Sequence, residues 1–236
     1  MRVEPDLASV AALIGDPSRA AMLTVLADGR ALPAGELARV AGLSLSGASA
    51  HLARLAQGGL IVAEREGRHR YYHLAGLEVA AALESLAALV KVDVRPRVCS
   101  PAMDALRRGR TCYDHLAGEL GVVLAQEWER RALLVPGEGK RLKVTDAGEH
   151  WFAEMFGVKT GSLRPGRHGI ACRCLDWTER RHHVAGPLGA ALLRCCRERG
   201  WIKQARQHTR AVELSAAGMT WVRETLGVRT SMETRS

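Results

Sequence analysis

All six cysteines of the chain lie after residue 98, and they are the residues best suited to chemistry. Cys112 and Cys174 each open a Cys-x-Asp triplet, which ends at Asp114 or Asp176. Thiolate, imidazole and carboxylate groups bind soft or borderline metal ions, and a thiol near cations is more acidic and more easily oxidised. We therefore expect an effector to act on this later part of the chain.

The residues leave three interpretations of the cysteines open. In the first, several thiolates bind a soft metal or metalloid ion, and the candidates are Cys172, Cys174, Cys195 and Cys196. In the second, a thiol pair responds to oxidants, since nearby arginines would lower a thiol pKa. In the third, the cysteines are small apolar side chains of the core. The cofactor, if there is one, is not identified by these patterns.

The second triplet is also followed by groups that suit an organic anion: an indole, two guanidinium groups and an imidazole. The same groups would equally form a structural ion-pair and packing motif. Taken together, the expected effector-binding residues are Cys112, Asp114, Cys174, Asp176, Trp177, Arg180, Arg181 and His183.

An internal repeat relates these two regions. The segment beginning His115-Leu-Ala-Gly resembles the one beginning His183-Val-Ala-Gly, and Val144-Thr-Asp-Ala-Gly resembles Leu214-Ser-Ala-Ala-Gly. Each copy is predicted to run helix, strand, turn, strand, capped helix, over about 102–160 and about 170–230. A shared role at a helix start explains both histidines without a ligand. We expect two winged-helix-like units packed on each other.

A second group of residues suits DNA rather than small ligands. A helix start rich in small polar groups can enter the major groove, and a basic hairpin can reach the backbone or the minor groove. The helix residues are Ser44, Ser46, Ser49, His51 and Arg54, and the hairpin residues are Arg65, Arg68, His69 and Arg70. Taken singly, each serine is better explained as a cap or a solvated position, and the arginines as a solvated hairpin.

The elements that position these groups follow from caps and periodicity. Asp16-Pro17 is typical of a helix start, and Gly58-Gly59 ends the helix that Ser44 caps. Leu45, Leu52 and Leu55 are expected on the inner face of that helix. The predicted helices are 7–14, 17–28, 33–41, 44–57 and 77–90, and the predicted strands are 60–64 and 69–74.

With these helices and strands in this order, residues 7–90 resemble the arsenic-repressor (ArsR/SmtB) family of bacterial winged-helix transcription factors. The matching segments are Asp16-Pro17-Ser18-Arg19, Glu36-Leu37-Ala38, Ser49-Ala50-His51-Leu52-Ala53-Arg54-Leu55, Gly59-Leu60-Ile61 and Gly67-Arg68-His69-Arg70-Tyr71-Tyr72-His73-Leu74. The resemblance implies a homodimer formed through the first and last helices of this unit. It also implies binding to an inverted-repeat operator in double-stranded DNA and release by an effector.

The metal positions common in that family are missing here. The helix predicted before the reading helix carries neither Cys nor His, and the predicted dimer helix offers only Glu78 and Glu84 as acidic ligands. Sensing is therefore expected in the later part of the chain.

Composition agrees with a DNA-binding class. The chain has 236 residues and a net charge of +9, which residues 96–236 carry, because positive and negative charges balance in residues 1–95. A basic protein suits a polyanionic partner, although scattered surface charge is the simpler explanation. No signal peptide and no membrane-spanning run is found, so we expect a cytoplasmic protein with reduced thiols and no membrane partner.

We thus predict a mainly α protein with small β-wings (α+β). Residues 1–92 form a winged helix-turn-helix domain for DNA binding and dimerisation, residues 93–101 a linker, and residues 102–236 a repeat-built effector domain. The predicted function is a sequence-specific transcriptional regulator, a dimeric repressor controlled by a metal, an oxidant or a small molecule. Whether binding represses or activates, and which genes it controls, is left open.

Two rival functions remain. One is a metal- or small-molecule-binding enzyme that carries a winged helix. The chain has no Gly-rich phosphate loop, nucleophile elbow or catalytic triad pattern, so no catalytic residue is named and a non-enzyme is predicted. The other is a winged helix that is used only for protein contacts.

Overall fold

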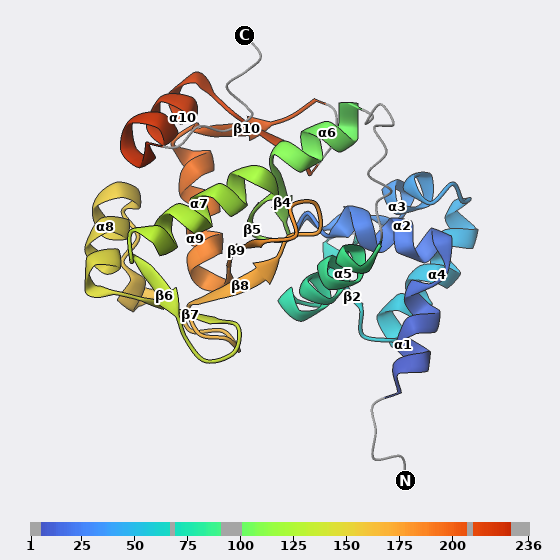
Figure 1. The fold of residues 1–236 in the computed structure, drawn as a ribbon. Helices are drawn as coiled ribbons and strands as arrows, with labels where there is room; N and C mark the ends of the chain where they lie inside the picture. Colours follow the sequence, from blue (N-terminus) through green and yellow to red (C-terminus); the bar gives the residue numbers. More distant parts are fainter. Residues whose placement is uncertain (1–5, 67–68, 91–100, 207–209, 228–236) are drawn as a thin grey trace. The chain divides into compact units, whose positions relative to one another are not determined.

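The computed structural model describes residues 6–66, 69–90, 101–206 and 210–227. It contains two compact units, Met1–Leu83 and Glu84–Ser236, and the boundary falls inside helix α5 (Leu77–Leu89) (Figure 1). The linker predicted over residues 93–101 lies outside the described residues, except for Pro101, the first residue of α6.

The first unit is a small helical domain with a three-stranded antiparallel sheet. Its sheet has the order β1-β3-β2, and β2 and β3 form the predicted hairpin. Short β1 was not expected from sequence. The elements are α1 (Leu7–Ile14), α2 (Pro17–Leu26), β1 (Leu32–Pro33), α3 (Ala34–Val40), α4 (Leu45–Gln57), β2 (Ile61–Glu66) and β3 (His69–Leu74).

The helix starts follow from local capping. The Asp16 carboxylate accepts a hydrogen bond from the Arg19 amide, and Ser44 Oγ accepts one from the Gly47 amide. On α4 the buried face consists of Ala48, Leu52 and Leu55. The expectation for Leu45 was wrong: its side chain is 59% exposed, because it lies in the first turn and the smaller Ala48 takes the first inward position.

The second unit carries a repeated element order. Each copy runs hairpin, helix, hairpin, capped helix, which adds a leading hairpin to the element order predicted from the sequence. The first copy contains α6 (Pro101–Arg108), β4 (Arg110–Cys112), β5 (His115–Ala117), α7 (Gly118–Arg130), β6 (Leu134–Pro136), β7 (Arg141–Val144) and α8 (Asp146–Phe156). The second contains β8 (Ala171–Leu175), β9 (His182–Ala185), α9 (Gly186–Glu198), β10 (Ile202–Gln204), β11 (Val212–Leu214) and α10 (Ala216–Trp221), with a 3₁₀ turn at Thr160–Ser162 before it and a π-helical turn at Val222–Leu226 after it.

The two copies exchange strands with each other. The β6–β7 hairpin of the first copy joins the β8–β9 hairpin of the second in one sheet, where Arg141 pairs with Cys172. In the matching place, Ala211 beside β11 forms a bridge to Arg110 on β4. Each trailing hairpin therefore extends the leading hairpin of the other copy.

The central helices follow the same exchange. Helix α7 packs on β9 and helix α9 packs on β5, and both lie in the middle of the unit (Figure 1). Their apolar faces, which include Trp128 of α7, share one core with Phe152 and Trp221. The capped helices also correspond, since Thr145 and Ser215 each accept a hydrogen bond from the amide three residues on. Among the described residues, no helix has the length and apolar character needed to cross a membrane.

Candidate functional site

The start of α4 presents the serines that the sequence singled out. Ser44, Ser46 and Ser49 are all exposed. Ser44 and Ser46 hydroxyls lie 3.1 Å apart, and Ser49 Oγ donates to the Leu45 carbonyl at 2.9 Å. Each hydroxyl oxygen keeps further hydrogen-bonding capacity for a phosphate or a base edge.

Further along α4 the two basic candidates differ in environment. Arg54 is exposed. His51 is half-buried, and its Nδ1 lies 3.4 Å from the Asp16 carboxylate at the start of α2. His51 therefore also helps to hold α4 against α2.

The β2–β3 hairpin carries the other basic candidates. Arg65 and Arg70 are directly opposite each other in the register, and both are exposed. His69 begins β3 opposite Glu66, whereas Arg68 lies outside the described residues. The first unit thus pairs a polar helix start with a wing that presents guanidinium groups.

A second candidate site lies inside the second unit, where the two leading hairpins meet. On the first hairpin Cys112 is directly opposite His115, and on the second Cys174 is directly opposite His183. Cross-strand partners point to the same face of a hairpin. Each copy of the repeat therefore supplies one thiol and one imidazole to the same place.

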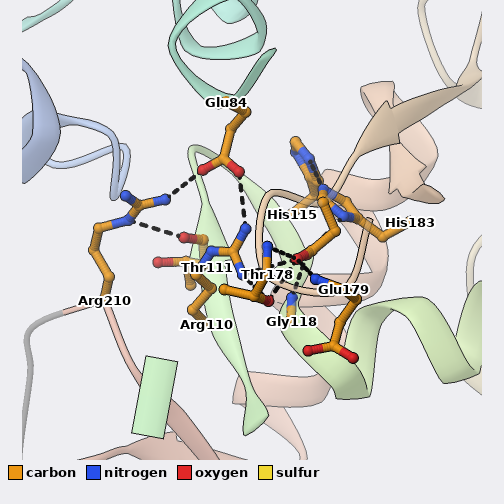
Figure 2. A network of polar contacts seen from close by, with 10 residues as sticks. Glu84, Arg110, Thr111, His115, Gly118, Thr178, Glu179, His183 and Arg210 are labelled. Atoms are coloured by element: carbon orange, nitrogen blue, oxygen red, sulfur yellow. Dashed lines mark hydrogen bonds and ion pairs between the residues drawn. The ribbon is translucent and has the colours of Figure 1, made fainter. Parts of the chain in front are cut away.

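These four side chains converge. Their ligand atoms all lie within 4.8 Å of one another. Figure 2 shows the two histidine rings, whose Nε2 atoms lie 3.1 Å apart. All four side chains are buried, and both histidines are 0% exposed. A hydrogen bond with Cys174, together with burial, raises the pKa of the Cys112 thiol to about 12. The centre thus combines two soft sulfur atoms with two borderline nitrogen atoms away from solvent.

Both Cys-x-Asp triplets place their carboxylate behind a histidine. Asp114 Oδ1 lies 3.0 Å from His115 Nδ1, and Asp176 Oδ2 lies 3.2 Å from His183 Nδ1. The second carboxylate also accepts from the Gly118 amide at 2.6 Å and from the Thr178 hydroxyl at 2.7 Å. These carboxylates orient the rings and leave both Nε2 atoms facing the centre.

A buried ion-pair network borders this centre. Glu84 binds Arg110 and Arg210 at 2.8 Å each, and Arg110 reaches Asp176 at 3.2 Å (Figure 2). Burial alone would raise the pKa of Glu84, but the two guanidinium groups hold it below its usual value. Burial would likewise raise the pKa of Asp176, but the adjacent His183 ring and the positive charge of Arg110 hold it below its usual value.

The remaining residues of the predicted effector set lie in different surroundings. Arg110 stacks over Trp177, with 5.0 Å between the guanidinium carbon and the ring centre. Arg180 and Arg181 line an open surface pocket of about 370 Å³, together with Gln126, Glu129, Arg173 and His182. Since Asp176 and His183 are fully buried, the eight residues do not line a single pocket.

The four cysteines predicted as a metal set are not gathered around one point. Cys195 donates to the Phe156 carbonyl at 3.2 Å, and Cys196 packs in the main core. Cys172 packs beside Cys112 and Cys174 but is not among the four converging ligands. His115 was missing from the predicted site, although its equivalence to His183 in the repeat was a usable signal.

Comparison with known proteins relates the chain to helix-turn-helix transcriptional regulators. A family model described as a helix-turn-helix domain matches residues 14–64. The chain is 38% identical over 228 residues to a Bacillus subtilis (strain 168) protein, the uncharacterized HTH-type transcriptional regulator YdfF, covering 96% of this chain and 100% of that protein. It is 41% identical over 87 residues to the Mycobacterium tuberculosis HTH-type transcriptional regulator CmtR, covering 37% of this chain and 73% of that protein.

Among solved structures, the homodimeric winged helix-turn-helix DNA-binding domain of a possible ArsR-family regulator from Mycobacterium bovis is 32% identical. It covers 36% of this chain and 86% of that one, with a TM-score of 0.32. A polar helix followed by a two-stranded wing defines the class of winged helix-turn-helix proteins. Within this class, the chain belongs to the ArsR family of HTH-type transcriptional regulators.

Proposed function

We propose that this transcriptional regulator binds an inverted-repeat operator as a homodimer and that its second unit receives the controlling signal. The observation that carries the proposal is the exposed polar start of α4 joined to a wing with exposed Arg65 and Arg70. Small hydroxyl side chains allow close approach to base edges, while guanidinium groups bind phosphates.

The dimer is supported by apolar side chains on two helices. Helix α1 has no buried residue, and Leu7 is 76% exposed. On α5, Leu89 is 76% exposed and Leu86 43% exposed. These are the two helices through which the family resemblance implies a dimer. A second copy of the chain would remove this apolar surface from water.

The absence of the family's common cysteine position from the first unit supports control through the second unit. Helix α3 carries neither Cys nor His, so the thiol position common in this family is absent there. The cysteines of the described residues lie in the second unit, as do the two histidines that face each other. We therefore propose a repressor that acts in the cytoplasm and has no catalytic activity.

Binding to the DNA upstream of the chain's own gene tests this function. We expect the purified, reduced protein to protect an inverted repeat there. Arg54→Ala should weaken binding to every sequence and reduce the steepness of its salt dependence by about one phosphate contact. The control is Arg164→Ala, a change of the same type at an exposed position of the second unit. The DNA-binding proposal fails if the wild-type protein protects no site there, and equal binding by Arg54→Ala and Arg164→Ala at all salt concentrations would exclude a phosphate contact by Arg54.

A further inference from the structure

The two histidines at the centre of the second unit face each other through the same nitrogen. Both Nδ1 atoms lie beside carboxylates, at 3.0 Å for Asp114 and 3.2 Å for Asp176. A neutral imidazole that donates from Nδ1 has a lone pair on Nε2. When both rings carry their proton on Nδ1, two such lone pairs converge at 3.1 Å in a buried place. A cation at this point would relieve their repulsion.

The distances suit a metal ion. Zn²⁺ binds imidazole nitrogen at about 2.0–2.1 Å and thiolate sulfur at about 2.3 Å. In a tetrahedron these lengths place neighbouring nitrogens about 3.4 Å apart and neighbouring sulfurs about 3.8 Å apart. The observed Nε2–Nε2 distance of 3.1 Å is close to the first value. All four ligand atoms lie within 4.8 Å of one another, which is compatible with the sulfur–sulfur distance of about 3.8 Å.

The surroundings also match those of a metal centre. A histidine that binds a metal ordinarily donates its other ring nitrogen to a carboxylate, which fixes the tautomer and the ring orientation. Here both histidines have such a carboxylate, and each comes from the Cys-x-Asp triplet of its own copy. A hydrogen-bonded histidine pair with no ion would account for the carboxylates but would give no role to the two thiols that face the pair.

We propose that Cys112, His115, Cys174 and His183 bind one divalent ion of the zinc class in a tetrahedral Cys₂His₂ site. Sulfur and imidazole ligands favour Zn²⁺ over Mg²⁺ or Ca²⁺, which prefer oxygen. On binding, each thiol releases its proton to the solvent and its sulfur forms a bond to the ion. The two thiolates balance the two positive charges, so the buried centre is neutral overall.

The position of the site gives the ion a structural role. Two ligands come from the hairpin of the first copy and two from the hairpin of the second. The ion therefore ties the two copies together. All coordination positions are taken by protein, and all four side chains are buried, which is typical of structural rather than catalytic zinc sites. The site does not depend on the proposed DNA binding, and its failure would leave operator binding intact.

Metal content and cobalt spectroscopy test the site directly. The full chain is reduced, stripped with a chelator and titrated with Zn²⁺, or with Co²⁺ as a coloured probe. We expect one equivalent of zinc per chain to be retained after gel filtration. Co²⁺ should give the strong visible absorption of a tetrahedral site together with a sulfur-to-cobalt charge-transfer band.

Matched variants locate the ligands. Cys112→Ala should abolish zinc retention, whereas Cys172→Ala, at a buried thiol on the same strand as Cys174, should keep it. Because removal of a buried ligand can impair folding, Asp114→Asn is the second variant. Its carboxylate is 40% exposed, so the fold should persist while zinc affinity falls about 10- to 100-fold. Asp146→Asn, at an exposed position on α8, is its control and should bind zinc normally.

Three results would overturn the proposal. The first is a folded, reduced wild-type chain that retains no zinc. The second is zinc binding that Cys112→Ala and Asp114→Asn leave unchanged. The third is a Cys112–Cys174 disulfide that forms under mild oxidants in a chain that takes up no metal even when fully reduced, which would make the centre a redox pair.

Discussion

His115 and His183 occupy the same position in the two copies of the repeat, and their Nε2 atoms lie 3.1 Å apart. Equivalent residues meet in this way only where the two copies face each other. The helices repeat the relationship: a Cβ added at Gly121 would lie 3.4 Å from His183 Cβ, and one at Gly189 would lie 3.1 Å from His115 Cβ. The centre of the second unit is therefore built twice from one pattern.

Removal of zinc should lower the melting temperature of the wild-type chain. An ion that binds only the folded state stabilises it by about 2.7 kcal/mol when present at a hundred times its Kd. Differential scanning fluorimetry with zinc and with excess chelator measures the shift. The Cys112→Ala variant should melt at the same temperature in both conditions. An equal shift in this variant would place the ion elsewhere.

Gly189→Ala should destabilise the second unit. A Cβ there would lie 2.6 Å from the Val184 carbonyl oxygen, closer than real side chains approach backbone. To relieve this clash, α9 must move away from β9, which should lower the free energy of unfolding by about 2 kcal/mol. Urea unfolding followed by tryptophan fluorescence checks this value. Gly161→Ala is the control, because nothing lies within 4 Å of its added Cβ, and its midpoint should match the wild type.

Glu84→Gln should destabilise the chain by about 3 kcal/mol at pH 7, because it leaves buried Arg110 and Arg210 without their shared carboxylate. The pKa of Glu84 is held below its ordinary value of 4.5. Its stabilising effect is therefore complete above that value and is lost as pH falls through the lower folded-state pKa.

The pH dependence of this variant separates charge from packing. The gap in unfolding free energy between wild type and Glu84→Gln should narrow steadily below about pH 4.5 and stay constant from pH 6 to pH 8. Urea titrations at several pH values measure it. A gap that remains the same at pH 3.5 would show that the charge of Glu84 contributes little.

Leu7→Glu should shift the protein from dimer towards monomer. The side chain is 76% exposed, so the charge is harmless to a single chain and unfavourable in an apolar interface. Light scattering gives the mass, and operator affinity should fall with it. Met103→Glu, at an exposed position on α6, is the matched control and should stay dimeric. Equal masses for both variants would exclude α1 from the interface.

Ser49→Ala should reduce sequence preference more than overall affinity. Its hydroxyl is exposed and bonds only to a carbonyl of its own helix among the contacts described, so its loss costs little stability. Competition between the operator and unrelated DNA at fixed salt measures the ratio of affinities. A ratio equal to that of the wild type would mean that this serine does not read a base.

Much of the first unit could be predicted because its signals are local. Ser44 caps α4, Gly58 and Gly59 end it, and the alternation in β3 places Tyr72 and Leu74 inside. The prediction that Leu45 lies on the inner face of α4 was wrong, because periodicity alone does not say where the neighbouring helices stop. The fold class and family followed from this unit.

The centre of the second unit could not be predicted in the same way. The repeat related His115 to His183, but the matching cysteines are 62 residues apart and the histidines 68, because the loop after Cys174 is longer than the turn after Cys112. Pairing between hairpins of different copies is a long-range choice that no local pattern encodes. For this reason the sequence favours a metal set of Cys174 with Cys195 and Cys196, which follow it in the chain, over one that includes His115.

The strand exchange has a consequence for how the second unit can be divided. The first copy taken alone would carry the β4–β5 hairpin and the β6–β7 half of the four-stranded sheet, with unpaired edges at β4 and β7, and half of the ligands at the centre. Two separate molecules of that copy could supply each other with everything missing, related by a twofold axis through the histidine pair. The second unit therefore has the geometry of a symmetric dimer whose two subunits are joined in one polypeptide chain.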